Sequence, residues 1–363
     1  MRKIIMTVMV CCPFLNACAA GTQRDPELKN RTPESLSHMG ASGSATQPRN
    51  PPLGACHGER RALTVSRQMP YHLVGVGGTE AHFVLDFGSN GSYIDVVDGF
   101  PAGAAPRPTS VDTYPNFNFF GAWGPVFLKP QSYKHISGTV RQAGKIGTDF
   151  LSLHVFTLDY SGNAIYRAQA GSFCTDAELR AEGFIPTTAG IYSNKPGMGK
   201  NDPPNIPSVP VRIGSVTAVG QVDTGFDDTD HRHSVNINRP YFDALQAAGV
   251  RLVPLGREEP SLTTCVRGVF DKITGYRLAG GASFEVLGSD GSVIVSAPDA
   301  VVFLKETPEA AKSCLGIGSL PHPAAQIGAS FYIDAGRMVF DPFTSRVWFG
   351  RAEPPARNVA PGT

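Results

Sequence analysis

The chain of 363 residues carries almost no net charge, and its N-terminal hydrophobic run is too short to span a bilayer. Its 32 lysines and arginines are balanced by 31 aspartates and glutamates, for a formal charge of +1. Nothing in this balance favours nucleic acid as a partner. The apolar run, residues 4–15, follows Arg2 and Lys3. Such a run is typical of a cleaved export leader, not of a transmembrane anchor.

The chain also lacks the motifs of several common enzyme classes. Residues 75–78 are glycine-rich, but no helix follows at the spacing that a dinucleotide or phosphate loop requires. Residues 316–320 lack the G-x-S-x-G pattern of a serine nucleophile. Residues 227–233 hold three carboxylates and two histidines, in no recognised ligand spacing. We therefore expect neither a metal nor a cofactor.

Glycine and proline are abundant, with 40 and 30 residues, which indicates many turns between short strands. We predict an all-β fold with few helices. Residues 283–287 and 292–295 flank a Gly-Ser-Asp-Gly turn and predict a hairpin. Helices are predicted at residues 175–182, with Thr175 as N-cap, and at residues 239–248, closed by glycine.

An aspartate ends a strand-like apolar run at two places, and glycine follows each after one residue. The stretches are Val84-Leu85-Asp86-Phe87-Gly88-Ser89 and Gln221-Val222-Asp223-Thr224-Gly225-Phe226. A short strand and turn, residues 71–77 and 209–215, lead to each aspartate. Taken singly, Asp-x-Gly is common turn chemistry, so a structural role for either aspartate is the alternative to a catalytic one.

A second pair of matched phrases follows the two aspartates. Residues 145–151 (Lys-Ile-Gly-Thr-Asp-Phe-Leu) and 326–332 (Gln-Ile-Gly-Ala-Ser-Phe-Tyr) each place an apolar residue before a glycine. Both continue into an alternating strand pattern, at residues 156–160 and 339–343. The chain is therefore an internal duplication, and a repeat this long indicates two lobes, not a solenoid.

These paired landmarks resemble the pepsin-like and retropepsin-like aspartic proteases, in which two homologous β-lobes each contribute an Asp-Thr-Gly motif and an apolar-apolar-Gly strand. The resemblance implies a bilobal pepsin-like fold. It places an N-terminal lobe at residues 56–193 and a C-terminal lobe at residues 208–351, joined by a Pro/Asn-rich linker at residues 194–207. The polar tail, residues 352–363, is expected to be disordered.

The resemblance implies an aspartic endopeptidase in which Asp86 and Asp223 activate water in the cleft between the lobes. One ionised carboxylate must take a proton from water, and one protonated carboxyl must donate a proton. Two aspartates about 3 Å apart cannot both ionise, so one shared proton serves both roles. Gly88 and Gly225 are expected to let the loops cross closely. Sequence does not assign the base to either aspartate.

Each motif departs from the family at a different position. Phe87 replaces the Thr or Ser whose hydroxyl, in the family, bonds across to the opposite loop, whereas Thr224 is retained. Phe226 replaces the Ser or Thr that supports the outer oxygen of the aspartate, whereas Ser89 is retained. Two alternatives to a protease therefore stay open: a catalytically degenerate homologue that binds peptides or an envelope component, and a structural envelope protein.

An aromatic, glycine-hinged stretch, residues 114–124, lies where the family places its flap hairpin. A flap closes over an extended peptide or protein substrate and excludes water. We expect Trp123 to contact the substrate, with Phe119 and Tyr114 as further candidates. Ordinary packing within a hairpin is the alternative. We expect the protein to be a monomer.

The N-terminal residues indicate export and attachment to a membrane. Leu15-Asn16-Ala17-Cys18 resembles a bacterial lipobox, in which the cysteine becomes the lipid-modified N-terminus; ordinary cleavage after Ala19 is the alternative. Residues 1–18 would then be the leader, and the polar residues 19–55 a flexible tether. The expected location is the periplasm, with Cys18 anchoring the protein to the outer membrane of a Gram-negative bacterium.

Four cysteines remain once the leader and Cys18 are set aside: Cys56, Cys174, Cys265 and Cys314. In an exported protein they suggest two disulfides, with three possible pairings. Bonds kept within the lobes pair Cys56 with Cys174 and Cys265 with Cys314. Buried free thiols are the alternative for one pair or both.

Overall fold

The computed structural model describes residues 53–133, 140–187, 206–228, 230–256, 262–264, 266–314 and 316–350. The predicted leader with Cys18, most of the tether and the tail lie outside these ranges, as do Cys265 and most of the predicted linker. No helix within these ranges is long and apolar enough to cross a membrane. Residues 53–187 are called the N-terminal half below, and residues 206–350 the C-terminal half.

The described residues form mainly β-strands, and their helices are short. The α-helices are α1 Thr148–Leu151, α2 Asp176–Ala181, α3 Arg239–Ala247 and α4 Ser330–Ala335. Segments of 3-10 helix are Ala55–His57, Ala170–Ser172, Glu309–Cys314 and Ile317–Ser319. The prediction of a mostly β fold with few helices is confirmed.

One sheet belongs to the N-terminal half and has the strand order β7-β6-β3-β4-β9-β5-β8, with β2 beside β3. Its strands are β2 Thr64–Ser66, β3 Met69–Val76, β4 Thr79–Leu85, β5 Tyr93–Ile94, β6 Thr113–Asn118, β7 Ala122–Phe127, β8 Lys129–Pro130 and β9 Gln142–Ile146.

A second sheet belongs to the C-terminal half and has the order β16-β18-β21-β15-β22-β14-β13-β19-β20, with β17 beside β18. Its strands are β13 Ser208–Ile213, β14 Val216–Val222, β15 Ser234–Ile237, β16 Leu252–Pro254, β17 Leu262–Thr263, β18 Phe270–Leu278, β19 Phe284–Leu287, β20 Val293–Ala297, β21 Val301–Glu306 and β22 Ala324–Ile327.

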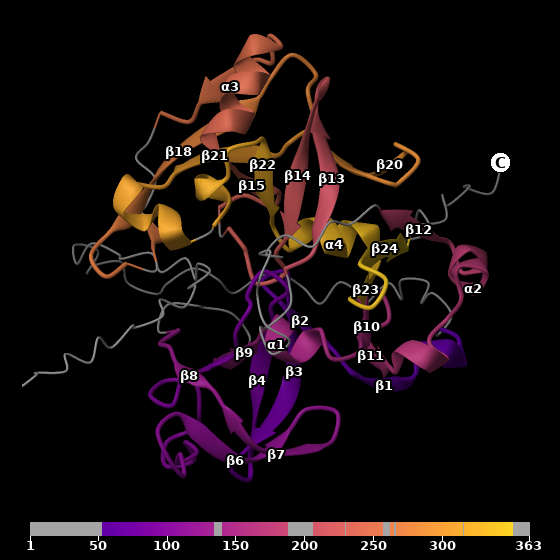
Figure 1. The fold of residues 1–363 in the computed structure, drawn as a ribbon, viewed down its shortest axis with the longest axis vertical. Helices are drawn as coiled ribbons and strands as arrows, with labels where there is room; N and C mark the ends of the chain where they lie inside the picture. Colours follow the sequence, from indigo (N-terminus) through magenta and orange to yellow (C-terminus); the bar gives the residue numbers. More distant parts are fainter. Residues whose placement is uncertain are drawn as a thin grey trace, which may run out of the picture.

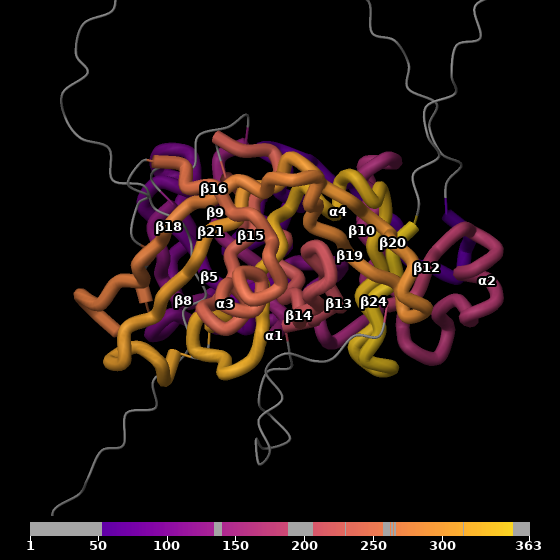
Figure 2. Tube along the Cα trace, turned by 90° about the horizontal axis from the view of Figure 1, so that it is seen from above, coloured from indigo at the N-terminus to yellow at the C-terminus, as the bar shows by residue number. Residues whose placement is uncertain are grey.

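The third sheet takes strands from both halves, in the order β1-β11-β10-β23-β24-β12. Its strands are β1 Glu59–Ala62, β10 Val155–Asp159, β11 Ala164–Ala168, β12 Phe184–Thr187, β23 Arg337–Asp341 and β24 Arg346–Gly350. At its centre β10 and β23 pair antiparallel, with Phe156 opposite Phe340. The sheet therefore joins the two halves, which lie one above the other in Figure 1 and overlap when seen from above in Figure 2.

The two halves repeat one strand arrangement. In the N-terminal half β4 runs parallel to β9, β5 pairs antiparallel with β9, and α1 follows β9. In the C-terminal half β14 runs parallel to β22, β15 pairs antiparallel with β22, and α4 follows β22. The internal repeat in the sequence is thus a repeat of topology.

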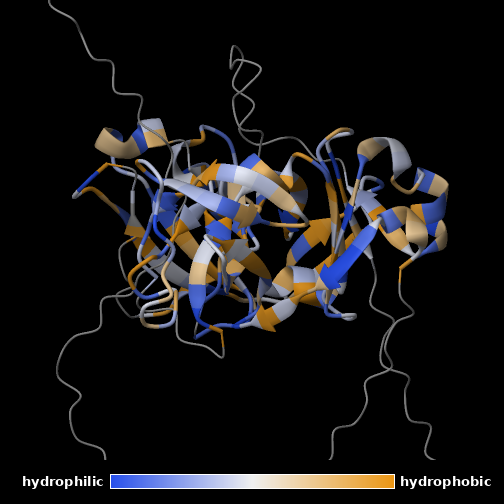
Figure 3. Cartoon of the chain, turned by 90° about the horizontal axis from the view of Figure 1, so that it is seen from below, coloured by the Kyte–Doolittle hydropathy of each residue, from blue (hydrophilic) through white to orange (hydrophobic). Residues whose placement is uncertain are grey.

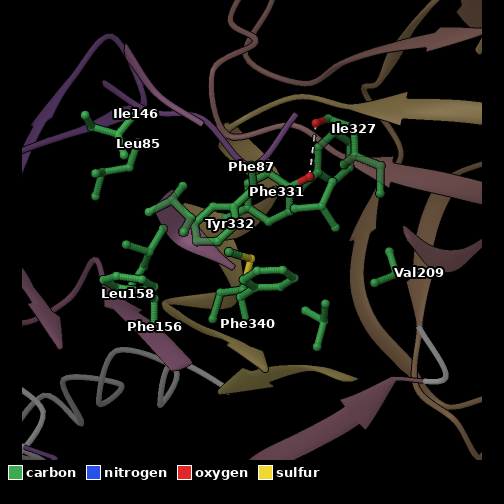
Figure 4. Packing of buried hydrophobic residues seen from close by; sticks show 14 of the residues in the cluster. Leu85, Phe87, Ile146, Phe156, Leu158, Val209, Ile327, Phe331, Tyr332 and Phe340 are labelled. Carbon is green, nitrogen blue, oxygen red and sulfur yellow. Dashed lines mark hydrogen bonds between the residues drawn. The ribbon is translucent and has the colours of Figure 1, made fainter. Parts of the chain in front are cut away.

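A continuous hydrophobic core extends through both halves. Hydrophobic and hydrophilic residues are interspersed along the strands, as the colours of Figure 3 show. In Figure 4, Leu85 and Ile146 of the N-terminal half lie in the same cluster as Phe331 and Tyr332 of α4 and Phe340 of the shared sheet. Burial of each large apolar side chain contributes about 1.5–3 kcal/mol. The core therefore holds rigidly the strands that end at the two aspartates.

Local signals in the sequence located α2 and α3. Thr175 caps α2: its side chain accepts a hydrogen bond from the Glu178 N–H, and the Glu178 carboxylate accepts from the Thr175 N–H. The side chain of Asn238 caps α3, and Gly249 beyond the helix has φ +74°. The predicted hairpin is present as β19 and β20.

A disulfide joins Cys56 to Cys174, as one of the predicted pairings has it. Cys314 is also disulfide-bonded. The Cys56–Cys174 bond spans 118 residues of chain, and closing so long a loop destabilises the unfolded state by about 5 kcal/mol in the chain-entropy description.

Candidate active site

The ends of two matched strands position Asp86 and Asp223. Asp86 follows β4, where Leu85 lies opposite Ile146 of β9, and Asp223 follows β14, where Val222 lies opposite Ile327 of β22. Each aspartate thus lies at the point where a strand of a buried parallel pair ends and a tight loop begins.

The loops after the two aspartates are fastened in the same way. The Ser89 carbonyl accepts a hydrogen bond from the Thr148 N–H at 2.8 Å, and the Phe226 carbonyl accepts one from the Ala329 N–H at 2.8 Å. In each half the donor directly follows the glycine of the Ile-Gly phrase. The two loops are therefore held in equivalent positions by their own half.

The structure brings Asp86 and Asp223, called the dyad below, together. A Cβ atom built on Gly88 would lie 2.2 Å from the Asp223 carboxyl carbon, and one built on Gly225 would lie 2.6 Å from that of Asp86. Any larger residue at either position would displace the opposite carboxyl group. Each glycine therefore lies directly against the opposite aspartate, and both aspartates are buried, 7% and 3% exposed.

Thr224 connects the two loops. Its hydroxyl donates to the Leu85 carbonyl at 2.5 Å and accepts from the Phe87 N–H at 3.1 Å. Phe87 has no hydroxyl to return these bonds. Its ring is fully buried and packs edge-on against Phe340, with ring centres 4.9 Å apart. The C-terminal half thus contacts the opposite loop through the Thr224 hydroxyl, whereas the N-terminal half contributes apolar packing by Phe87 at the equivalent position.

The carboxylate oxygens have different partners on their two sides. Asp86 Oδ1 accepts from the Gly88 N–H at 2.9 Å, and Asp223 Oδ1 accepts from the Gly225 N–H at 3.0 Å. Asp86 Oδ2 forms an ion pair with Lys145 Nζ at 3.3 Å. Asp223 Oδ2 accepts from Gln326 Nε2.

Ser89 does not support the outer oxygen of Asp86 as the sequence suggested. Its hydroxyl donates to the Gly91 carbonyl at 2.8 Å. The outer oxygens instead face Lys145 and Gln326, which sequence analysis left unassigned. A signal for both residues was present, since each lies directly before the isoleucine of the Ile-Gly phrase and directly after a small residue, Gly144 or Ala325.

Burial and charge repulsion make the dyad a coupled pair. Burial, together with the neighbouring Asp86 carboxylate, raises the pKa of Asp223 to about 8. A hydrogen bond with Asp86 acts in the same direction, whereas Gln326 and Lys145 lower the pKa of Asp223. Burial and the nearby charge therefore favour a protonated carboxyl group within the dyad.

A tyrosine hydroxyl completes the C-terminal side of the site. The Asp223 N–H donates to Tyr332 Oη at 3.0 Å, and this hydroxyl donates to the Ile327 carbonyl at 3.1 Å, drawn as a dashed line in Figure 4. The corresponding bond in the N-terminal half is direct, from the Asp86 N–H to the Ile146 carbonyl at 2.9 Å.

A turn of the N-terminal half reaches the loop after Asp223. Arg67 Nε lies 3.3 Å from Asp227 Oδ2, and Gln68 Nε2 donates to Asp227 Oδ1 at 3.0 Å. Burial raises the pKa of Asp227 to about 6, and Arg67 opposes that shift. This contact adds a polar connection between the halves beside the dyad.

The remaining polar residues of segment 227–233 have separate partners. Asp228 Oδ1 accepts from the N–H groups of Asp230 and His231. His233 bonds to Asp299 at 2.9 Å and to Asp334 at 2.7 Å. Burial by itself would lower the pKa of His233, but the hydrogen bonds with Asp334 and Asp299 and their negative charges together outweigh burial and raise it. The segment therefore forms side-chain contacts with three different regions.

One cluster of potential metal ligands occurs among the described residues: Cys56, His57 and Cys174, with ligand atoms within 4.8 Å of one another. Both sulfurs are joined in the disulfide, and a disulfide sulfur is not the thiolate that binds a metal. The cluster is therefore structural.

The structure does not bring the predicted flap residues to the dyad. Tyr114 and Phe119 are buried, 3% and 1% exposed, in the core of the N-terminal half. Trp123 packs edge-on against Phe150 at 5.2 Å and donates its Nε1–H to the Phe119 carbonyl. Packing within the half thus occupies all three aromatic side chains.

The β6–β7 hairpin that carries these aromatics joins the sheet away from the dyad. Asn118 lies opposite Gly75, which itself lies opposite Glu80 near the start of β4. Leu85, beside the dyad, is at the other end of β4, about 17 Å away along a strand. Figure 1 also shows β6 and β7 at the end of the N-terminal half that faces away from the C-terminal half.

Comparison with known proteins gives little further identification. No protein-family model matches the sequence, and no curated protein matches it. Among solved structures, the chain is similar to basic 7S globulin from soybean, with 12% sequence identity and a TM-score of 0.37 over 81% of this chain and 95% of that chain. These values do not place the chain in a family. Fold and site by themselves define a mostly β protein with a buried aspartate pair between matched halves.

Proposed function

We propose that the protein is an aspartic-type endopeptidase with a bilobal, pepsin-like fold. The observation that carries the proposal is the direct contact of two buried carboxyl groups, one from each half, with the pKa of Asp223 raised to about 8. Such a pair holds one proton across the neutral range. A protonated acid beside an ionised base is what hydrolysis by carboxylates and water requires.

In the proposed reaction, the ionised carboxylate takes a proton from water while the water oxygen attacks the peptide carbonyl carbon. The protonated carboxyl donates its proton to the carbonyl oxygen, which gives a neutral tetrahedral diol. On collapse of the diol, one hydroxyl returns its proton to the carboxylate that had donated. The other carboxyl then protonates the leaving nitrogen as the C–N bond breaks, and the dyad again holds one proton.

The connections between the loops support this chemistry. Thr224 bonds to both the Leu85 carbonyl and the Phe87 N–H, and Gly88 and Gly225 each lie against the opposite carboxyl group. Preorganised groups lose little rate to misplacement, whereas a shift of about 1 Å can cost on the order of a hundredfold. The dyad is thus fixed before a substrate binds.

A second candidate is a peptide-binding protein without hydrolytic activity. Phe87 favours this candidate, because its buried ring contributes no hydroxyl to the connection between the loops. The region around the dyad would then hold an extended peptide or an envelope component without cleaving it.

The proposed setting is the one expected from the N-terminal sequence. Basic residues, a short apolar run and the lipobox-like Leu15-Asn16-Ala17-Cys18 support export and a lipid anchor at Cys18 in the outer membrane. The disulfide between Cys56 and Cys174 agrees with an oxidising compartment. We propose that the protein acts there as a monomer on extended peptide or protein substrates.

The experiment that tests the function is a mixed peptide library offered to the purified protein from about pH 3 to about 9, with products identified by mass spectrometry. Asp86→Asn should abolish cleavage, because the site then has no carboxylate pair. The screen should be run with the N-terminal residues 19–52 present and removed. Peptide binding without cleavage at every pH would favour the second candidate and overturn the first.

A further inference from the structure

Lys145 places a cation inside the buried site. It is 3% exposed, and its Nζ lies 3.3 Å from Asp86 Oδ2 and 4.6 Å from the centre of the Tyr93 ring. A buried ion without a partner pays a large desolvation penalty. The Lys145 ammonium and the Asp86 carboxylate therefore stabilise each other's charged form.

The C-terminal half has a neutral amide at the equivalent position. Lys145 lies opposite Val84 and Tyr93, and Gln326 lies opposite Gln221 and Asn236. An amide N–H donates to a carboxyl group without adding charge, whereas an ammonium favours the ionised carboxylate. Equivalent strand positions in the two halves therefore place a charged partner beside Asp86 and a neutral partner beside Asp223.

Hydrogen bonding fixes the orientation of the amide. Gln326 Oε1 accepts from Asn236 Nδ2 at 3.0 Å, which leaves Gln326 Nε2 to face Asp223. The donor that meets Asp223 is therefore set by its own half and adds no charge to the site.

The net charge of the buried site favours one protonation state of the dyad over the other. With Lys145 positive and both aspartates ionised, the site would carry a net negative charge in a poorly solvated interior. With one aspartate protonated it is neutral, and burial favours the neutral state. Since Lys145 contacts Asp86, the ionised member is Asp86, and the proton lies on Asp223.

We propose that Lys145 is a positioning residue of the site, which keeps Asp86 ionised as the base and leaves Asp223 as the acid. The proposal rests on the proposed hydrolytic function for its catalytic meaning. It converts two aspartates with matched backbones into a pair with a fixed direction of proton transfer. The duplicated halves would thus bring the two carboxyl groups together, and Lys145, which has no charged counterpart in the C-terminal half, would set the direction of proton transfer.

Other ionisable groups face this region from the elements packed around it: Tyr93 of β5, Tyr71 of β3, Lys129 of β8, Asp149 of α1, Asp95 and Tyr133. Burial raises the pKa of Tyr93 to about 12, so its ring is neutral across the range of interest. Asp149 is held by the Ser92 hydroxyl at 2.7 Å and by the Ser92 N–H at 2.9 Å. Lys145 forms its ion pair with Asp86 in the middle of these groups.

The test compares Lys145→Met with the matched control Lys305→Met. Lys305 is as buried as Lys145 and pairs with Asp271 at 3.1 Å in the sheet of the C-terminal half. Carboxyl carbon NMR on protein labelled at aspartate follows the titration of the dyad, with signals assigned from Asp86→Asn and Asp223→Asn. The pH dependence of kcat/KM is measured on a peptide found in the library screen.

In Lys145→Met, the dyad should titrate at higher pH than in the unaltered protein, because a cation that favours both ionised forms is gone. The acidic limb of the kcat/KM profile should move upward with it, with about tenfold less activity at a fixed acidic pH for each unit of displacement. Lys145→Arg should retain the original profile. Lys305→Met should lower stability and leave the titration of the dyad unmoved.

An unchanged titration in folded Lys145→Met would overturn the proposal. So would lost cleavage with an unchanged titration, which would make Lys145 a substrate contact. Failure of the hydrolytic function has a different signature: no peptide is cleaved by the unaltered protein, while the titration still moves in Lys145→Met. If Lys145→Met does not fold by circular dichroism, Lys145→Gln, which copies the amide of the other half, provides the same comparison.

Discussion

The two halves of the molecule hold their aspartates with the same backbone and different side chains. In the N-terminal half the Asp86 N–H bonds directly to the Ile146 carbonyl, and the outer oxygen meets the Lys145 ammonium. In the C-terminal half the Tyr332 hydroxyl relays the backbone bond, and the outer oxygen meets the Gln326 amide.

This comparison separates the features that the two halves share from the features in which they differ. The strand pairing and the loops are repeated, which brings the two carboxyl groups to one place. The side chains behind them are not repeated, and they differ in charge. A symmetric pair would share its proton evenly, whereas unequal neighbours assign it to one side.

The largest expected effect comes from removing the carboxyl group of one half. Asp223→Asn should lower kcat on a cleaved peptide by about a hundredfold to ten-thousandfold, the usual contribution of a general acid or base. Single-turnover kinetics would measure the loss. Retention of most activity would show that Asp86 works without a partner from the other half.

The same substitution should raise stability at neutral pH. The unfolded pKa of Asp223 is near 3.8 and the folded value is about 8, so between them the folded state binds more protons than the unfolded state. The free energy of unfolding therefore falls as pH rises from about 4 to about 8, and Asp223→Asn removes this slope. Denaturant unfolding at several pH values measures it; equal slopes in both proteins would contradict the coupled dyad.

Phe87→Thr tests whether the apolar side of the Thr224 connection can be made polar. Removal of a fully buried ring that packs on Phe340 should lower the free energy of unfolding by about 3 kcal/mol or more. The added hydroxyl should not raise kcat/KM, since the loop is already held by Thr224. Phe87→Leu is the control, with a smaller loss of stability. A more active Phe87→Thr would show that the missing hydroxyl limits the site.

Tyr332→Phe tests a smaller difference between the halves, the tyrosine hydroxyl that is present behind Asp223 and has no counterpart behind Asp86. It removes the hydroxyl between the Asp223 N–H and the Ile327 carbonyl, which leaves two buried backbone groups without this bond. The expected loss is about 1–3 kcal/mol in the free energy of unfolding. Tyr241→Phe, whose hydroxyl donates to the Val216 carbonyl at 3.2 Å outside the dyad, is the control. Equal effects on kcat of these two variants would argue against a role of the relay in placing Asp223.

Local and repeated features could be predicted from sequence because the residues that cause them are adjacent. The Thr175 cap acts on the Glu178 N–H three residues away, and the hairpin of β19 and β20 surrounds its own turn residues. The aromatic hairpin β6–β7 was expected to contact the substrate because it is rich in aromatics and lies where the resembled family places its flap. Whether Phe119 faces a cleft or a core depends on packing with distant strands, which composition does not report.

The amino-acid sequence by itself determined that two matched β halves each end a buried strand at an aspartate and turn at a glycine, because these signals lie within a few neighbouring residues. Tertiary structure alone decided which side chains stand behind the carboxyl groups. Lys145 is 59 positions from Asp86 in the printed chain, and only the pairing of β9 with β4 brings its ammonium to the carboxylate. Electrostatic energy depends on distance through space and on burial, and neither is written in the order of residues along the chain.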